Sequence, residues 1–116
     1  MKLLITGGLG FVGSHLVDLL VKKNHKIKIL TKTLSKKKNI KKSSKKIQIE
    51  KIDLTNFRRL GKIIEKFKPD VIIHLAGNAS HSKSFENPLK DIDSNAKTTL
   101  FMLEKIRKLN TPCKFI

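Results

Sequence analysis

The stretch LLITGGLGFVGSHLVDLL, residues 3–20, joins an apolar run to a cluster of glycines and then to an apolar helical pattern. Residues 2–6 are mostly apolar at consecutive positions, which is typical of a strand covered on both faces in a parallel sheet. Apolar side chains then recur at helical spacing, so residues 11–23 are predicted to form a helix. The glycines therefore lie in the turn between a buried strand and a helix.

Gly7, Gly10 and Gly13 are spaced three residues apart in this turn. Glycine there permits a tight turn, a close approach of the backbone to a pyrophosphate, and packing of the helix on the strand. The amides near Phe11 and Val12 are expected to be unpaired donors at the positive end of the helix dipole, which suits a phosphate. A glycine triplet alone is a weak motif and can be a turn without a ligand. Its place between strand and helix favours a dinucleotide site.

Strands and helices alternate along the remaining sequence. The predicted strands span residues 2–6, 26–30, 46–52, 71–76 and 113–116. The predicted helices span residues 11–23, a segment from Thr55 as the N-cap to Phe67, and residues 91–109. Polar loops are predicted at 32–46, with room for one helical turn, and at 77–88.

This alternation, without hairpin turns, implies βαβ units and a parallel sheet. Right-handed crossovers and the strand order 3-2-1-4-5 give an α/β doubly wound parallel sheet, the Rossmann fold, which here stops within the fifth strand. The 116 residues form one dinucleotide-binding domain in this interpretation, residues 1–116, without a substrate lobe.

The chain is strongly basic, with 26 Lys and Arg against 9 Asp and Glu. This charge permits binding to nucleic acid or other phosphates, and the alternative is a set of solvated lysine-rich faces. A nucleic-acid interface at Lys36–Lys46 is not favoured, because that loop has no stacking aromatic residues. The single cysteine, Cys113, fits a reduced, cytoplasmic setting, and no apolar run approaches the roughly 20 residues that span a bilayer.

Four motifs resemble those of the extended short-chain dehydrogenases/reductases, in the group of NAD(P)-dependent sugar-nucleotide epimerases and dehydratases. The opening glycine segment is similar to the family fingerprint T-G-x-x-G-x-x-G. The other three matching segments are DLTN at 53–56, PDVIIHLAG at 69–77 and SFENPLKDIDSNAKTTLFMLE at 84–104. They follow one another in the family's order and cover nearly the whole chain.

The resemblance implies a set of residues that hold NAD(P). Asp53 and Leu54 would contact the adenine, and the segment ending in Gly77 would lie along the nicotinamide ribose. Asp53 could instead be an acid that leads a helix, and Asn95 could cap or bond within its own helix. His74 is expected to be a satisfied core residue and not a proton carrier. The cofactor-binding residues implied are Gly7, Gly10, Phe11, Val12, Gly13, Thr31, Lys32, Asp53, Leu54, Leu75, Ala76, Gly77 and Asn95.

The choice between NAD and NADP depends on the end of the second strand. NAD-preferring relatives place an acid there to hold the ribose hydroxyls. Here Thr31 and Lys32 occupy that place, and a lysine attracts a 2′-phosphate where an acid would repel it. NADP(H) is therefore favoured over NAD(H), with Lys32 as the expected contact. The alternative is that Lys32 belongs to the solvated lysine-rich loop.

The catalytic chemistry of the family requires a Tyr-x-x-x-Lys pair, and this chain contains no tyrosine. No catalytic residue is therefore predicted, and the sequence analysis assigns no metal ligand either. The chain is expected to be the N-terminal part of a longer enzyme, binding dinucleotide without turnover of a nucleotide-sugar. A non-catalytic dinucleotide-binding sensor or scaffold is the alternative. A sheet that stops at its fifth strand would leave apolar surface uncovered, which predicts marginal stability or association into a homo-oligomer.

Overall fold

Within the described residues of the computed structural model, 1–40, 45–78 and 80–116, five parallel strands form one sheet. Their order is β3-β2-β1-β4-β5, which confirms the predicted order. The strands are β1 (Lys2–Thr6), β2 (Lys26–Thr31), β3 (Ile47–Lys51), β4 (Val71–His74) and β5 (Lys114–Phe115). The α/β doubly wound class is therefore confirmed.

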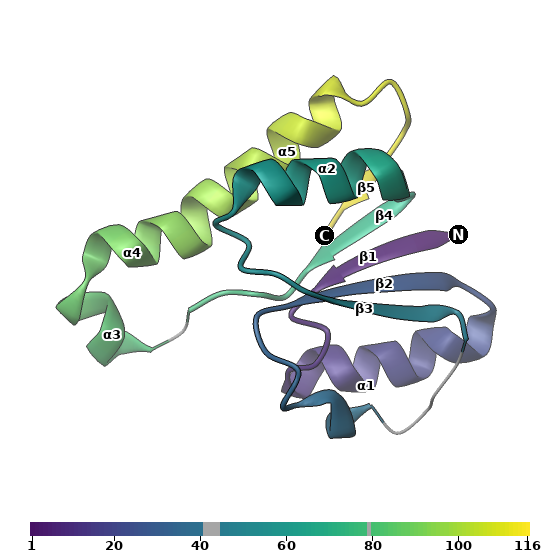
Figure 1. Ribbon diagram of the computed structural model, residues 1–116, viewed down its shortest axis with the longest axis horizontal. Helices are drawn as coiled ribbons and strands as arrows, with labels where there is room; N and C mark the ends of the chain where they lie inside the picture. The colour runs from purple at the N-terminus through teal and green to yellow at the C-terminus, as the bar shows by residue number, and fades with distance from the viewer. Residues whose placement is uncertain (41–44, 79) are drawn as a thin grey trace.

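Helices cover both faces of the sheet (Figure 1). One face is covered by α1 (Phe11–Leu20), which continues into the short 3₁₀ helix η1 (Val21–Lys23). The other face is covered by α2 (Phe57–Phe67) and α5 (Thr98–Lys108), which lie beside each other. This arrangement follows from right-handed crossovers on opposite sides of β1.

Two apolar clusters, one on each face, form the core. Successive side chains of a strand point to opposite faces, so β1 contributes to both clusters. Leu3 and Ile5 pack in the cluster with α1, whereas Leu4 packs in the cluster with α2 and Met102 of α5. Leu4 and Ile5 are fully buried, which explains the uninterrupted apolar pattern of this central strand.

The N-cap of α2 lies one residue later than predicted. Asn56 is the N-cap, and its side-chain oxygen accepts a hydrogen bond from the Arg59 amide at 3.1 Å. The predicted cap, Thr55, is wrong, because its hydroxyl and amide both donate to the Asp53 carboxylate. Threonine and asparagine are both good caps, so composition alone did not separate them.

The predicted loop at 77–88 contains a helix that the sequence analysis missed, α3 (His81–Glu86). The next helical segment also starts earlier than predicted, with Pro88 at the first position of α4 (Pro88–Ile92), and passes through the π-helical turn η3 (Asp93–Lys97) into α5. These segments form an arm that projects beyond the sheet (Figure 1). The loop at 32–46 has the predicted helical turn, η2 (Lys37–Asn39), and residues 41–44 lie outside the described residues.

Candidate functional site

Gly7 makes the turn that leaves β1. Its φ is +68°, a conformation that L side chains rarely adopt, and its amide donates to the Leu30 carbonyl at 3.0 Å. A Cβ atom added at Gly7 would lie 2.8 Å from the Ala76 nitrogen. Glycine here therefore allows the turn after β1 to touch the backbone that follows β4.

Gly10 and Gly13 set the start of α1 against this turn. Gly10 is the N-cap, has no side chain to accept a hydrogen bond, and accepts the Ser14 amide at 2.9 Å. A Cβ atom added at Gly13 would lie 2.7 Å from the Gly8 Cα, so Gly13 allows the helix to pack on the turn. Among the described residues no side chain caps the first turn of α1, so its amides are available to water or to a ligand.

A cavity of about 370 Å³ lies at the carboxyl edge of the sheet, beside this turn. The chain runs from β1 outward to β2 and β3 on one side and to β4 and β5 on the other. The cavity is therefore at the point where the strand order reverses, which is where doubly wound sheets bind ligands. Segments that follow four strands contribute to its wall.

Nine of the predicted cofactor-binding residues line this cavity: Gly7, Gly10, Thr31, Lys32, Asp53, Leu54, Leu75, Ala76 and Gly77. Four do not line it, namely Phe11, Val12, Gly13 and Asn95. Phe11 is 81% exposed, and neither Phe11 nor Val12 lines the cavity, so the contact expected of them with a ligand is through the backbone amides that open α1. The lining also includes residues that the sequence analysis did not assign to the cofactor: Leu9, Leu30, Thr33, Lys36, Ile52, Thr55, Asn78 and Ser94.

Most of the residues that were missed are immediate neighbours of the predicted ones. Thr33 and Lys36 follow the end of β2, and Thr55 follows the predicted Asp-Leu pair. Their position just after a strand was the available signal, because every parallel strand ends at this edge. Ser94 comes from η3, far along the chain, and nothing in the local sequence distinguishes it from a loop serine.

Lys32 and Asp53 form an ion pair in the wall of the cavity, with 2.9 Å between Lys32 Nζ and Asp53 Oδ2. The Asp53 carboxylate also accepts the hydroxyl and the amide of Thr55. The hydrogen bond from Lys32 and those from Thr55 lower the pKa of Asp53 to about 2. Asp53 is therefore ionised at neutral pH, and the positive charge of Lys32 is partly offset.

His74 at the end of β4 has its Nδ1 2.6 Å from the Thr6 hydroxyl oxygen. The same hydroxyl oxygen accepts the Ala76 amide at 3.2 Å. Burial lowers the pKa of His74, because the charged imidazolium loses solvation. His74 thus joins the ends of β1 and β4, and this agrees with the expectation of a satisfied structural residue.

Asn95 supports the cavity through Asn78. The Asn95 side-chain oxygen accepts the Asn78 amide at 2.8 Å, and its side-chain nitrogen donates to the Asn78 carbonyl at 3.0 Å. Both asparagine side chains also donate to Asp91 Oδ1. The segment after β4 is in this way fixed to the arm, and Asn95 lies behind the cavity wall.

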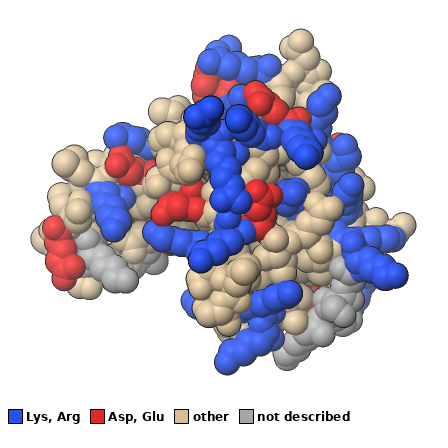
Figure 2. Space-filling view, in the orientation of Figure 1, with Lys and Arg blue, Asp and Glu red and all other residues tan. Residues whose placement is uncertain are grey.

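A second cavity, of about 700 Å³, adjoins the first on the side of the arm. It shares Lys32, Asp53, Thr55, Asn78 and Ser94 with the first cavity, so the two form one continuous groove. The residues of the arm that line it include Glu86, Lys90 and Asp93. Figure 2 shows a notch in the surface between the arm and the rest of the molecule.

The described part of the chain contains no group of three or more His, Cys, Asp or Glu residues that could hold a metal ion. None of the helices in residues 1–40, 45–78 and 80–116 has the length and apolar character to cross a membrane.

A glycine turn and a cavity at the reversal of strand order, on a doubly wound parallel sheet, define the Rossmann class of domains. Residues 4–116 match the family described as GDP-mannose 4,6 dehydratase. The chain belongs to this family, which is part of the NAD-dependent epimerases and dehydratases.

Three relatives illustrate the similarity. CDP-paratose 2-epimerase of Salmonella typhi is 36% identical over 124 residues, which include 100% of this chain and 36% of the relative. UDP-glucose 4-epimerase of Thermus thermophilus, solved in complex with NAD, superposes with a TM-score of 0.79 at 30% identity and covers 93% of this chain and 34% of that one. UDP-glucose 4-epimerase of Thermotoga maritima, solved with UDP-glucose, has a TM-score of 0.84 at 28% identity and covers 99% of this chain and 37% of that one. The chain thus spans about a third of the length of these relatives.

Proposed function

We propose that this chain is the NAD(P)-binding part of a sugar-nucleotide epimerase or dehydratase, and that the cavity beside Gly7 and Gly10 receives the dinucleotide. The observation that carries the proposal is the glycine turn that borders the cavity. Gly7 and Gly10 line the cavity, and Gly13 allows the start of α1 to lie against the same turn. A pyrophosphate there would accept hydrogen bonds from the first amides of α1 and lie at the positive end of its dipole.

In this proposal, the two ends of the dinucleotide contact different parts of the cavity lining. Asp53, Leu54 and Lys32 lie on the side of β2 and β3 and would hold the adenosine. Leu75–Gly77 lies after β4 and would hold the nicotinamide ribose. When bound, the cofactor supplies hydride transfer at its nicotinamide ring. The chain's own residues bind and orient it.

NADP(H) is the cofactor favoured in this proposal. Lys32 and Lys36 both line the cavity beyond β2, and no carboxylate follows β2 directly. The ion pair of Lys32 with Asp53 reduces the attraction of this region for a 2′-phosphate. Lys36 has no carboxylate partner in the part of the chain that the structure describes. Lys36 therefore supports the preference independently of Lys32.

The substrate proposed for the whole enzyme is a nucleotide-sugar, in agreement with the UDP-glucose bound by the Thermotoga maritima relative. Turnover requires a proton donor and acceptor beside the nicotinamide. These 116 residues contain no tyrosine, and His74, the histidine at the end of β4, is hydrogen-bonded to Thr6 and has its pKa lowered by burial. We therefore expect the 116 residues alone to bind dinucleotide without converting a nucleotide-sugar.

Self-association of the chain is part of the same proposal. Large apolar side chains are exposed on the arm and on α5, notably Phe85, Leu89 and Leu100. Exposed apolar surface of this kind favours contacts between copies. Light scattering over a concentration series would test it, and a mass of one chain at every concentration would contradict it.

The experiment that tests the cofactor site is calorimetric titration of the chain with NADP(H) and with NAD(H), repeated with Gly10→Val. A Cβ atom at Gly10 would have one close neighbour, the Gly7 carbonyl oxygen at 3.1 Å, so the larger side chain can extend into the cavity without disrupting the core. We expect binding by the parent chain and at least a tenfold loss in the variant. Absence of binding by a folded parent chain would refute the proposal, and tighter binding of NAD(H) would refute the NADP preference alone.

A further inference from the structure

The face of the sheet beneath α2 is polar on β2 and on the neighbouring edge strand β3. Leu30 of β2 packs in the apolar cluster with α2, and alternation along the strand places Lys28 and Lys26 on the same face. Gln48 and Glu50 of β3 are the register partners of Lys28 and Leu30 and lie on this face too. An apolar surface would be expected where a helix covers a sheet, so this polar strip needs its own explanation.

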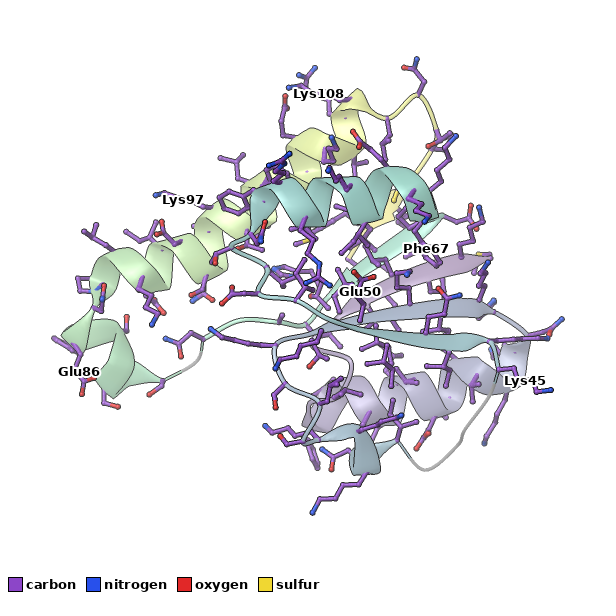
Figure 3. All side chains as sticks on the ribbon, viewed as in Figure 1. Lys45, Glu50, Phe67, Glu86, Lys97 and Lys108 are labelled. Carbon is purple, nitrogen blue, oxygen red and sulfur yellow. The ribbon has the colours of Figure 1, made fainter. Side chains whose placement is uncertain are left out.

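The partly buried carboxylate of Glu50 pairs with two of the cations on this face. Glu50 Oε2 lies 3.4 Å from Lys28 Nζ, and Glu50 Oε1 lies 3.1 Å from the Arg59 guanidinium of α2. The Lys28 side chain is only 18% exposed, and its ammonium also lies over the Phe67 ring, 5.6 Å from the centroid. Figure 3 shows Glu50 and Phe67 in the space between α2 and the strands β2 and β3. Glu50 thus holds a lysine and an arginine in fixed positions under the helix.

The facing side of α2 adds further positive charge. Arg59, Lys62 and Lys66 are spaced three and four residues apart, so they share one face of the helix along a row of about 10 Å. Lys62, Lys66 and Lys26 have no carboxylate partner among residues 1–40, 45–78 and 80–116. Arg59 has five N–H donors, and Glu50 occupies only part of them.

These side chains enclose a groove of about 460 Å³, which we call the basic groove. Its lining is Lys26, Lys28, Gln48, Glu50, Arg59, Lys62, Ile63, Lys66 and Phe67. Five cations therefore face one carboxylate, and this local excess of positive charge attracts anions. Figure 2 shows Lys and Arg gathered over α2 on this face of the molecule.

We infer that the basic groove is a binding site for an oligophosphate anion, separate from the dinucleotide cavity. The two share no lining residue. A short chain of phosphates matches a row of cations of this length, and the guanidinium of Arg59 can bind phosphate oxygens through paired N–H groups. The groove offers no platform for a base, because the Phe67 residue is only 7% exposed and Lys28 lies over its ring. This favours a ligand recognised through phosphate alone over a nucleic acid.

The inference is tested by titrating the 116-residue chain with tripolyphosphate, followed by calorimetry. Lys62→Gln/Lys66→Gln removes two charges from the basic groove, and Lys22→Gln/Lys23→Gln removes the same charge from exposed positions of η1 on the opposite face. We expect the groove variant to bind at least about tenfold more weakly and the control less than twofold. Glutamine is a good helix former, and an unchanged thermal midpoint would show that α2 is intact.

Two further titrations separate the possible outcomes. Binding of tripolyphosphate must persist when NADP(H) is present in excess, and loss of binding under that condition would place the anion in the dinucleotide cavity and overturn the inference. An oligothymidylate that binds the groove more tightly than tripolyphosphate would assign the groove to nucleic acid instead. Equal weakening in both double variants would show a response to net charge alone, and this would also overturn the inference.

Discussion

Lys32 Nζ lies 2.9 Å from Asp53 Oδ2, so the residue that follows β2 is paired with the carboxylate that follows β3. Both residues line the same cavity. The sequence predicted them separately, with Lys32 as a contact for a 2′-phosphate and Asp53 as a contact for the adenine. Because they are paired, neither can change its ligand interactions without changing those of the other.

This pairing makes Asp53→Asn a test of cofactor preference. Asparagine retains an oxygen for the two hydrogen bonds from Thr55, but it loses the charge that attracts Lys32. Lys32 would then be available to a 2′-phosphate, so the ratio of NADP(H) to NAD(H) affinity is expected to rise by about 3- to 10-fold. Calorimetric titration with both cofactors measures the ratio, in which any effect on the shared adenosine largely cancels.

The reciprocal variant, Lys32→Gln, is expected to lower the same ratio by about tenfold, because it leaves Asp53 as an unpaired negative charge in the cavity. Lys37→Gln is the matched control, since Lys37 is exposed in η2 and does not line the cavity. A ratio that stays constant in all three variants would show that the 2′-phosphate does not bind near Lys32.

Gly7 and Gly10 are predicted to differ in what they contribute to stability. Alanine at Gly7 would have to adopt φ of +68° and place its Cβ 2.8 Å from the Ala76 nitrogen, so Gly7→Ala is expected to cost about 2–4 kcal/mol of unfolding free energy. Gly10→Ala meets only the Gly7 carbonyl oxygen, at 3.1 Å, and should cost less than about 1 kcal/mol. Urea unfolding of the two variants measures the difference, and equal losses would contradict this account of the turn.

The strand order was predictable because alternation of strands and helices, together with the handedness of crossovers, leaves few arrangements. The glycine turn was predictable because its three roles each require the absence of a side chain. By contrast, α3 was missed because His81–Glu86 is short and its sequence, HSKSFE, has no apolar periodicity. The arm therefore depends on contacts between α3 and α4, which the linear pattern does not show.

Pairings between side chains could not be predicted for a different reason. Lys32 and Asp53 are 21 positions apart, and the Lys32 side chain is 73% exposed, so the sequence could not distinguish a paired lysine from the other solvated lysines of its loop. The basic groove likewise combines residues of β2, β3 and α2. In the sequence, the charged residues of each of these elements are typical of a solvent-exposed face. Asn95 was identified through a family motif, but its bonds to Asn78 required the fold to bring η3 beside the end of β4.

His74 is predicted to make the stability of the chain depend on pH. Its pKa is lowered in the folded state, so below about pH 6.5 the unfolded chain takes up a proton that the folded chain does not. The free energy of unfolding should therefore fall as the pH drops from about 6.5 toward 5. His74→Gln keeps a hydrogen-bonding group near Thr6 and should reduce this slope. Thermal midpoints between pH 8 and pH 5 give the slopes, and an identical slope in the parent chain and the variant would count against the assignment.

Asn95 is predicted to act as a positioning residue for the wall of the dinucleotide cavity. Asn95→Ala removes the bonds to the amide and carbonyl of Asn78 and the bond to Asp91, and should cost about 1–3 kcal/mol of unfolding free energy. Because Asn78 lines the cavity, its amide should also exchange with deuterium at least about tenfold faster, and NADP(H) should bind more weakly. Asn110→Ala is the control, since Asn110 is exposed beyond the end of α5. If Asn95→Ala lowered stability but left both the exchange at Asn78 and the cofactor affinity unchanged, Asn95 would only stabilise the arm and would have no part in shaping the site.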